Sequence, residues 1–144
     1  MAAVRVTAAL LDTQPLLWAL ADDPRLPAAI AERIRAEPEG YGVSDVCLWE
    51  IAIKRSIGKL RVPDDLPRAI AEIGFSQVAI TRHQVWAVGN MPLHHRDPFD
   101  RLLVAQAMDL DLPVVSSDRA LADYDIAVVW EQLDQCGPSP HRHA

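Results

Sequence analysis

The sequence contains no long apolar run and little cysteine. None of its hydrophobic stretches approaches the ~18 residues that a membrane-spanning helix needs. Only two cysteines occur in 144 residues, Cys47 and Cys136, so a disulfide framework is not expected. The start of the chain lacks a secretory pattern, because its short apolar stretch leads directly into Asp12. These absences predict a cytoplasmic protein that does not enter a membrane.

Several motifs of well-known enzyme classes are also missing. The chain has no Gly-x-Gly-x-x-Gly or Gly-Lys-Ser/Thr loop for a nucleotide, no Cys/His set at zinc spacing, and no Gly-x-Ser-x-Gly elbow. Its net charge of −6 argues against a simple electrostatic nucleic-acid binder, which is normally basic. A nuclease is still compatible with this charge, because a bound metal ion can locally neutralise acids.

The chain alternates short apolar runs with helix-like segments, which is typical of βαβ units. This pattern predicts one α/β domain with a mainly parallel sheet flanked by helices, over residues 1–134, followed by a loose tail at residues 135–144. The expected strands are Val4–Leu11, Tyr41–Val43, Gln77–Ile80, Val114–Ser116 and Ile126–Trp130. The expected helices are Pro15–Ala21, Ala28–Ala36, Asp45–Ile57, Leu66–Ile73, Arg82–Val88, Asp97–Leu110 and Asp118–Tyr124.

One helix, Asp45–Ile57, carries an apolar stripe at three- and four-residue spacing. The stripe consists of Val46, Trp49, Ile53 and Ile57, and we expect it to face the core, with Trp49 buried. The alternative for Trp49, and for Trp18 in the first helix, is contact with another protein chain. Cys47 in the same helix is expected to be a small buried hydrophobic residue.

Four acids occupy positions that the surrounding pattern would fill with a neutral residue. Asp12 and Asp118 directly follow apolar strand-like runs, so both are expected at the carboxyl edge of the sheet, where ligands bind in such folds. Glu50 lies within an apolar helix, where it either points into a site or pairs with Lys54. Asp100 opens a helix, and a simple crossover would place it at the opposite edge, while the long loop before it, Asn90–Arg96, leaves either edge open. Purely structural roles as helix caps remain open for Asp12, Asp100 and Asp118.

If the four acids converge, their mutual repulsion requires a cation, and ligands that are all oxygens favour Mg²⁺ or Mn²⁺. Such a site suits the hydrolysis of a phosphate ester. Thr13 and Ser116 could orient a carboxylate or the attacking water. Arg101 could hold phosphate oxygens or form an ion pair that offsets the acids. For the adjacent pair His94 and His95 the alternatives are a role in a loop and joint ligation of a metal ion, and the loop role is expected because neighbouring side chains diverge on a regular element.

These residues resemble the PIN-domain ribonucleases, and in particular the VapC-type toxins of bacterial toxin–antitoxin modules. The resemblance covers about residues 6–130. Its most specific part is His94–Ala107, which contains Asp-Pro-Phe-Asp at residues 97–100. The matching segments are Leu10–Thr13, Leu16–Leu20, Val43–Lys54, Gly58–Leu60, Leu93–Ala107, Pro113–Asp118 and Tyr124–Trp130. The chain departs from the family pattern at Gln14, where His is frequent, and at Ser116, where Thr is frequent.

The resemblance implies a compact PIN-like α/β/α nuclease domain and a Mg²⁺- or Mn²⁺-dependent endoribonuclease. Asp12, Glu50, Asp100 and Asp118 match the acids that hold the metal, and Asp97 matches a supporting acid. It also implies a homodimer, an RNA substrate, and inhibition by a small cognate antitoxin that covers the groove with an apolar helix. The alternative is a catalytically silent PIN-like or receiver-like binding module. A receiver needs a lysine near its last strand, whereas Lys54 and Lys59 both come too early.

Overall fold

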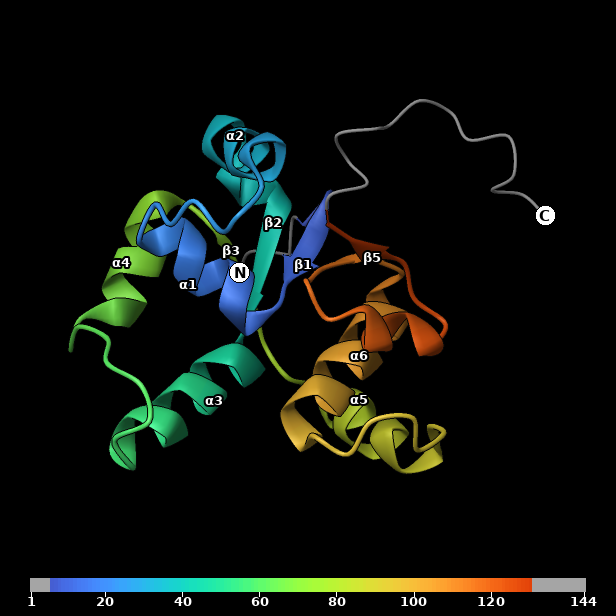
Figure 1. Cartoon of the computed structure of the whole chain (residues 1–144). Helices are drawn as coiled ribbons and strands as arrows, with labels where there is room; N and C mark the ends of the chain where they lie inside the picture. Colours follow the sequence, from blue (N-terminus) through green and yellow to red (C-terminus); the bar gives the residue numbers. More distant parts are fainter. Residues whose placement is uncertain (1–5, 131–144) are drawn as a thin grey trace, which may run out of the picture.

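A computed structural model describes residues 6–130 of the chain and shows a five-stranded sheet flanked by helices (Figure 1). All four strand pairs are parallel, in the order β3-β2-β1-β4-β5. The strands are β1 Ala9–Leu11, β2 Tyr41–Ser44, β3 Ser76–Val78, β4 Val114–Val115 and β5 Val128–Val129. The helices are α1 Thr13–Leu20, α2 Ala28–Ala36, α3 Asp45–Ser56, α4 Leu66–Ile73, α5 Arg82–Ala87 and α6 Pro98–Leu110. The described part of the chain also has three 3₁₀ turns, η1 Pro38–Gly40, η2 Val88–Asn90 and η3 Arg119–Asp123.

The predicted α/β class with a parallel sheet between helices is confirmed. Figure 1 shows α1 and α4 on one side of the sheet and α5 and α6 on the other. Every residue of β1, β2 and β4 is buried, as expected for parallel strands that are covered on both faces. The strand order also differs from the 2-1-3-4-5 order of receiver-like folds, which argues against that alternative.

Four of the five strands are shorter than the sequence pattern predicts, whereas β2 extends one residue further than expected, to Ser44. β1 begins at Ala9 rather than Val4, β3 covers Ser76–Val78 rather than Gln77–Ile80, and β5 covers only Val128–Val129. In place of the expected last helix, Asp118–Tyr124, the structure has the 3₁₀ turn η3. Asp118 caps this turn, because its carboxylate accepts a hydrogen bond from Ala120 N. The apolar runs therefore extend past the ends of the strands into loops, because a residue next to a strand can be buried without forming hydrogen bonds to a neighbouring strand.

Polar side chains cap the first turns of α1, α3, α5 and α6, whereas α2 and α4 begin without a side-chain cap hydrogen bond. Ser44 caps α3 by accepting a hydrogen bond from Val46 N at 3.0 Å, and Thr81 forms a capping box with Gln84 at the start of α5. The first helix begins at Thr13, two residues earlier than expected, directly after Asp12, whose carboxylate accepts a hydrogen bond from Thr13 N. Gly74 ends α4 in a left-handed conformation (φ 108°), which glycine adopts without strain.

A buried polar network links α6 to β2 and α5. The Ser44 hydroxyl donates to Gln106 Oε1, and Gln106 Nε2 donates to the carbonyl of Ala79 at 3.2 Å and to Gln84 Oε1 at 3.0 Å. Gln84 Nε2 in turn donates to Asp109 at 3.0 Å. Ser44, Gln84 and Gln106 are almost fully inaccessible to solvent. Since Ser44 also caps α3, this network fixes the start of the helix that carries Glu50.

The prediction that Trp49, Ile53 and Ile57 face the core is wrong. Trp49 is 49% exposed and Ile57 is 60% exposed, whereas α3 buries Val46, Cys47, Glu50 and Ile51. The inward face of α3 thus contains an acid, so a search for an apolar stripe selects the outer face instead. Burial of Cys47 is confirmed, and burial raises the pKa of its thiol to about 12.

Among residues 6–130, no helix is long and apolar enough to cross a membrane. The predictions for Val4, Cys136, and the tail at residues 135–144, with its boundary at residue 134, lie outside the described residues.

Candidate active site

A pocket of about 520 Å³ opens at the carboxyl ends of β1 and β4, and all four of the acids singled out from the sequence line it. This is the edge where ligands bind in parallel sheets. The lining residues are Asp12, Thr13, Gln14, Leu17, Glu50, Lys54, Lys59, Leu60, Asp97, Asp100, Ser117 and Asp118. The fold therefore brings together side chains that are separated by more than 100 positions in the sequence.

Asp12 and Asp118 are tied to each other through Ser116. The Ser116 hydroxyl donates to Asp12 Oδ2 at 2.7 Å, and its oxygen accepts a hydrogen bond from Asp118 N at 3.0 Å. The other oxygen of Asp12 accepts from Thr13 N at 2.9 Å, so Asp12 also caps α1. Asp12 therefore both caps α1 and lines the pocket, two roles that the sequence analysis gave as alternatives. Ser116 has the orienting position expected of it.

Glu50 enters the pocket from α3 and is buried, with both carboxylate oxygens engaged. The Thr13 hydroxyl donates to Oε1 at 2.7 Å, and the Lys54 amino group contacts Oε2 at 2.6 Å. This hydrogen bond raises the pKa of Lys54, which keeps its positive charge next to the acids. Glu50 thus both faces the pocket and pairs with Lys54, so the two alternatives were not exclusive.

Asp100 reaches the pocket from the first turn of α6. The cap of that helix is Asp97, whose Oδ1 accepts from Phe99 N at 2.8 Å and Asp100 N at 3.1 Å. The expectation that a crossover would place Asp100 at the opposite edge is wrong. A helix that connects parallel strands runs back along the sheet, so it begins at the carboxyl edge.

The acids strongly influence one another. Burial, followed by the charges of Asp12 and Asp97, raises the pKa of Asp100 to about 7, although His95 opposes the shift. Burial also raises the pKa of Asp12, against the hydrogen bonds from Ser116 and Thr13. These carboxylates are difficult to ionise together without a cation. Clustered carboxylate oxygens are the donor chemistry of a hard divalent ion, so the residues present fit Mg²⁺ or Mn²⁺.

Because the pKa of Asp100 is raised in the folded protein, stability should depend on pH when chelator removes divalent ions. The free energy of unfolding is expected to fall as pH rises from about 4 to about 7, because the folded state retains a proton that the unfolded chain has lost. The fall should be on the order of 1–2 kcal/mol, since solvent screens a partly exposed group. Urea unfolding at pH 5, 6, 7 and 8 in EDTA measures it.

The matched variant for this experiment is Asp100→Asn. Asparagine does not titrate, so the variant should lose this part of the pH dependence and be the more stable protein at pH 8. An identical pH dependence in the two proteins would show that Asp100 has an ordinary pKa.

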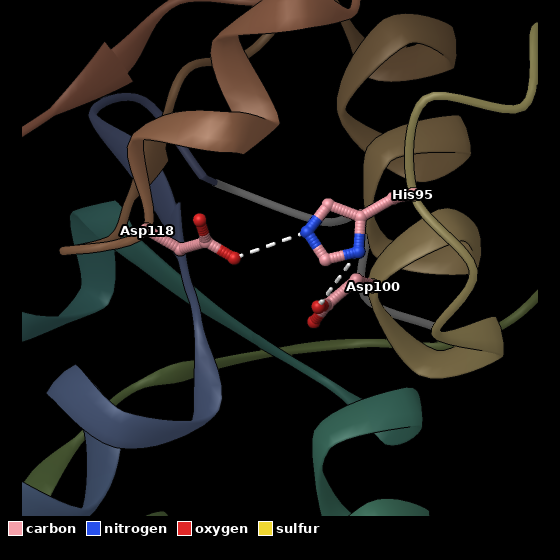
Figure 2. Close-up of side chains that lie close together, drawn as sticks. All are labelled: His95, Asp100 and Asp118. Carbon is pink, nitrogen blue, oxygen red and sulfur yellow. Dashed lines mark hydrogen bonds and ion pairs between the residues drawn. The ribbon is translucent and has the colours of Figure 1, made fainter.

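His95 is a site residue that the sequence analysis assigned only to a loop. Figure 2 shows its imidazole between the carboxylates of Asp118 and Asp100. Nε2 lies 3.1 Å from Asp118 Oδ2, and Nδ1 lies 3.7 Å from Asp100 Oδ2. His94 points elsewhere, with its ring 5.0 Å from that of Tyr124. The signal that could have identified His95 is its position in the loop directly before Asp-Pro-Phe-Asp, since that loop must approach the pocket.

Arg101 braces this loop instead of facing the acids. Its guanidinium donates to the carbonyls of Val88, Pro92 and His95 at 3.0–3.3 Å, and to the hydroxyl of Tyr124 at 3.2 Å. The expectation that Arg101 holds phosphate or pairs with an acid is therefore replaced by a structural role. Cations at the pocket come instead from Lys54 and Lys59.

Comparison with known proteins points to one family. The family model described as the PIN domain matches residues 9–127. No curated protein matches the chain significantly in sequence.

Similar solved structures include VapBC2 from Rickettsia felis, bound to a DNA fragment from its promoter, with a TM-score of 0.64 at 12% identity over 86% of this chain and 99% of that chain. A toxin–antitoxin complex from Klebsiella pneumoniae matches with a TM-score of 0.58 at 15% identity, over 85% of this chain and 96% of that chain. PAE2754 from Pyrobaculum aerophilum matches with a TM-score of 0.62 at 17% identity, over 91% of this chain and 95% of that chain. At these identities the likeness shows a shared fold.

Proposed function

Since the chain belongs to the PIN domain family, we propose that it is a Mg²⁺- or Mn²⁺-dependent endoribonuclease that acts as the toxin of a toxin–antitoxin pair. The observation that carries the proposal is the single pocket lined by Asp12, Glu50, Asp100 and Asp118. The toxin role is supported by the resemblance of the sequence to VapC-type proteins and by similar folds in structures described as VapBC or toxin–antitoxin complexes.

In this mechanism, Asp12 and Asp118 would be direct metal ligands, because Ser116 holds them next to each other. Glu50 and Asp100 would complete the site through the metal or through water. A bound divalent ion supplies a water of lowered pKa and stabilises the charge that develops on the phosphate. Lys54 and Lys59 line the same pocket and would attract the RNA backbone. Attack of water would leave a 3′ hydroxyl and a 5′ phosphate.

The direct test is cleavage of structured RNA by the purified chain with Mg²⁺ or Mn²⁺. Cleavage is expected with metal and should be abolished by EDTA, because the acids then lack their cation. Ligation-based mapping of the cut ends should find 5′ phosphates. Cleavage that continues in EDTA, or no cleavage of any RNA with either metal, would contradict the proposal.

The antitoxin would lie in a second groove, of about 650 Å³, that runs beside α1 and α4. Its lining is mainly apolar and includes Leu17, Trp18, Leu60, Val62, Leu66 and Ile73. Gln14, Leu17 and Leu60 line both this groove and the acidic pocket, so the two are continuous. One apolar helix in the groove could therefore send a basic side chain to the acids. We expect a small protein encoded directly upstream to co-purify with the chain.

The homodimer would form through the outer faces of α3 and α5, both of which contact α6. Trp86 on α5 is 80% exposed, next to the exposed Val85, and α3 exposes Trp49, Ile53 and Ile57. Exposed apolar side chains on one side of a protein indicate an interaction surface. A second copy is the expected partner, since the sequence resembles a family of homodimers.

Trp86→Asp is therefore expected to convert the dimer into a monomer in multi-angle light scattering, because it places a charge in the apolar contact. Leu93→Asp, at a 65% exposed position outside both helices, serves as the control and should leave the dimer intact. A parent protein that is monomeric at high micromolar concentration would contradict the dimer.

A further inference from the structure

His95 lies outside the lining of the acidic pocket, but its imidazole contacts two acids that line it, Asp100 and Asp118. His95, Asp100 and Asp118 each offer a ligand atom, and these three atoms lie within 4.8 Å of one another. Octahedral ions with metal–ligand distances of about 2.1 Å place neighbouring ligands about 3 Å apart and opposite ligands about 4.2 Å apart. The 3.1 Å separation of His95 Nε2 and Asp118 Oδ2 fits two neighbouring ligands (Figure 2).

The backbone of His95 is held in place on both sides of its side chain. Its N–H donates to the hydroxyl of Tyr124 at 3.0 Å, and its carbonyl accepts from Arg101 at 3.3 Å. Tyr124 is buried, and Arg101 also donates to the carbonyls of Val88 and Pro92. Four hydrogen bonds from one guanidinium therefore fix the loop that aims the imidazole at the acids.

We propose that His95 supplies a nitrogen ligand to the metal ion, so that the site has mixed nitrogen and oxygen donors and binds Mn²⁺ more tightly than Mg²⁺. The inference rests on the proposed function for the metal itself and adds a ligand to the four acids. Mg²⁺ prefers oxygen and keeps several waters, whereas a nitrogen donor favours transition-metal ions. Asp100 Oδ2 lies 3.7 Å from Nδ1, where a small shift would let it accept the other ring proton and orient the imidazole.

The test detects the metal–nitrogen bond itself. Pulsed electron paramagnetic resonance of the full chain with one equivalent of Mn²⁺ should show modulation from a coupled ¹⁴N nucleus. In His95→Ala the ¹⁴N signal should disappear, and Mn²⁺ affinity should fall by roughly tenfold or more. Mg²⁺ affinity, measured by competition with Mn²⁺, should fall less.

His94→Ala is the matched control, because its ring contacts Tyr124 instead of the acids, and it should keep the ¹⁴N signal. His95→Gln is a second variant that keeps a polar side chain in the loop, and circular dichroism checks that each variant is folded. Gln should restore much of the loop structure but not the nitrogen signal.

Two results would overturn the inference while leaving the metal site intact. One is Mn²⁺ that binds tightly, and is lost in Asp12→Asn, but shows no ¹⁴N coupling that depends on His95. The other is an equal loss of Mn²⁺ and Mg²⁺ affinity in His95→Ala, which would make His95 a positioning residue. Failure of the parent to bind either ion, or binding that Asp12→Asn leaves unchanged, would instead overturn the metal site of the proposed function and the ligand with it.

Discussion

Asp12→Asn is expected to lower the rate of RNA cleavage by about 10³-fold or more, equivalent to roughly 4 kcal/mol of transition-state stabilisation. Asp12 is central because it follows β1 directly and bonds to Ser116 and Thr13 on either side. The substitution preserves size and removes the charge that would hold the ion. Rates are measured with a defined RNA under single-turnover conditions at saturating Mg²⁺ or Mn²⁺.

The same variant should not unfold the protein. Burial raises the pKa of Asp12, so an uncharged side chain relieves a cost in the metal-free state, and the variant in EDTA should be at least as stable as the parent. Asp22→Asn is a suitable control, because Asp22 is exposed and its left-handed conformation (φ 52°) also suits asparagine. A folded Asp12→Asn protein that cleaves within threefold of the parent rate would refute the site.

Gln106→Leu is expected to lower the free energy of unfolding by about 3 kcal/mol. Leucine has a similar volume, so the loss comes from polar groups and not from a cavity. The Ser44 hydroxyl, the Ala79 carbonyl and Gln84 Oε1 would each lose a buried hydrogen-bond partner. Denaturant unfolding at fixed pH in EDTA measures the change without a contribution from metal.

The control is Gln77→Leu, which removes an exposed hydrogen bond to Asp45 of 3.2 Å and should cost less than about 1 kcal/mol. If Gln106→Leu unfolds at the same denaturant concentration as the parent, then the buried network contributes little to the free energy of unfolding. Since Ser44 caps α3, the variant should also weaken the placement of Glu50, visible as a lower cleavage rate in the protein that remains folded.

The parts of the site that follow strands could be predicted from the sequence. Asp12 and Asp118 directly follow buried apolar runs, and parallel strands must end at one edge, so their proximity needs no side-chain detail. Caps such as Ser44 and Asp97 are equally local, because the hydrogen bonds that they accept lie within three residues. For these residues, helix-capping preferences and the shared carboxyl edge of parallel strands were enough to predict their positions.

The remaining features depend on packing between distant segments. The pairing of Glu50 with Lys54 follows from their spacing on α3, whereas the hydrogen bond from the Thr13 hydroxyl of α1, which engages the other carboxylate oxygen, cannot be read from the periodicity of α3. His95 reaches the acids because Arg101 and Tyr124 hold a loop without regular structure. In both cases the decisive partner is a polar contact, and hydrophobic patterns do not report such contacts.

The Ser116 hydroxyl connects the two ends of the chain's functional region, because it bonds to Asp12, which lies 104 positions earlier. Because β4 is the strand that pairs with β1 and leads to Ser116 and Asp118, a chain cut short before β4 lacks both of these residues. Such a product would carry Asp12 without Ser116 to hold its carboxylate, so the cleavage proposed for this pocket should be absent from it.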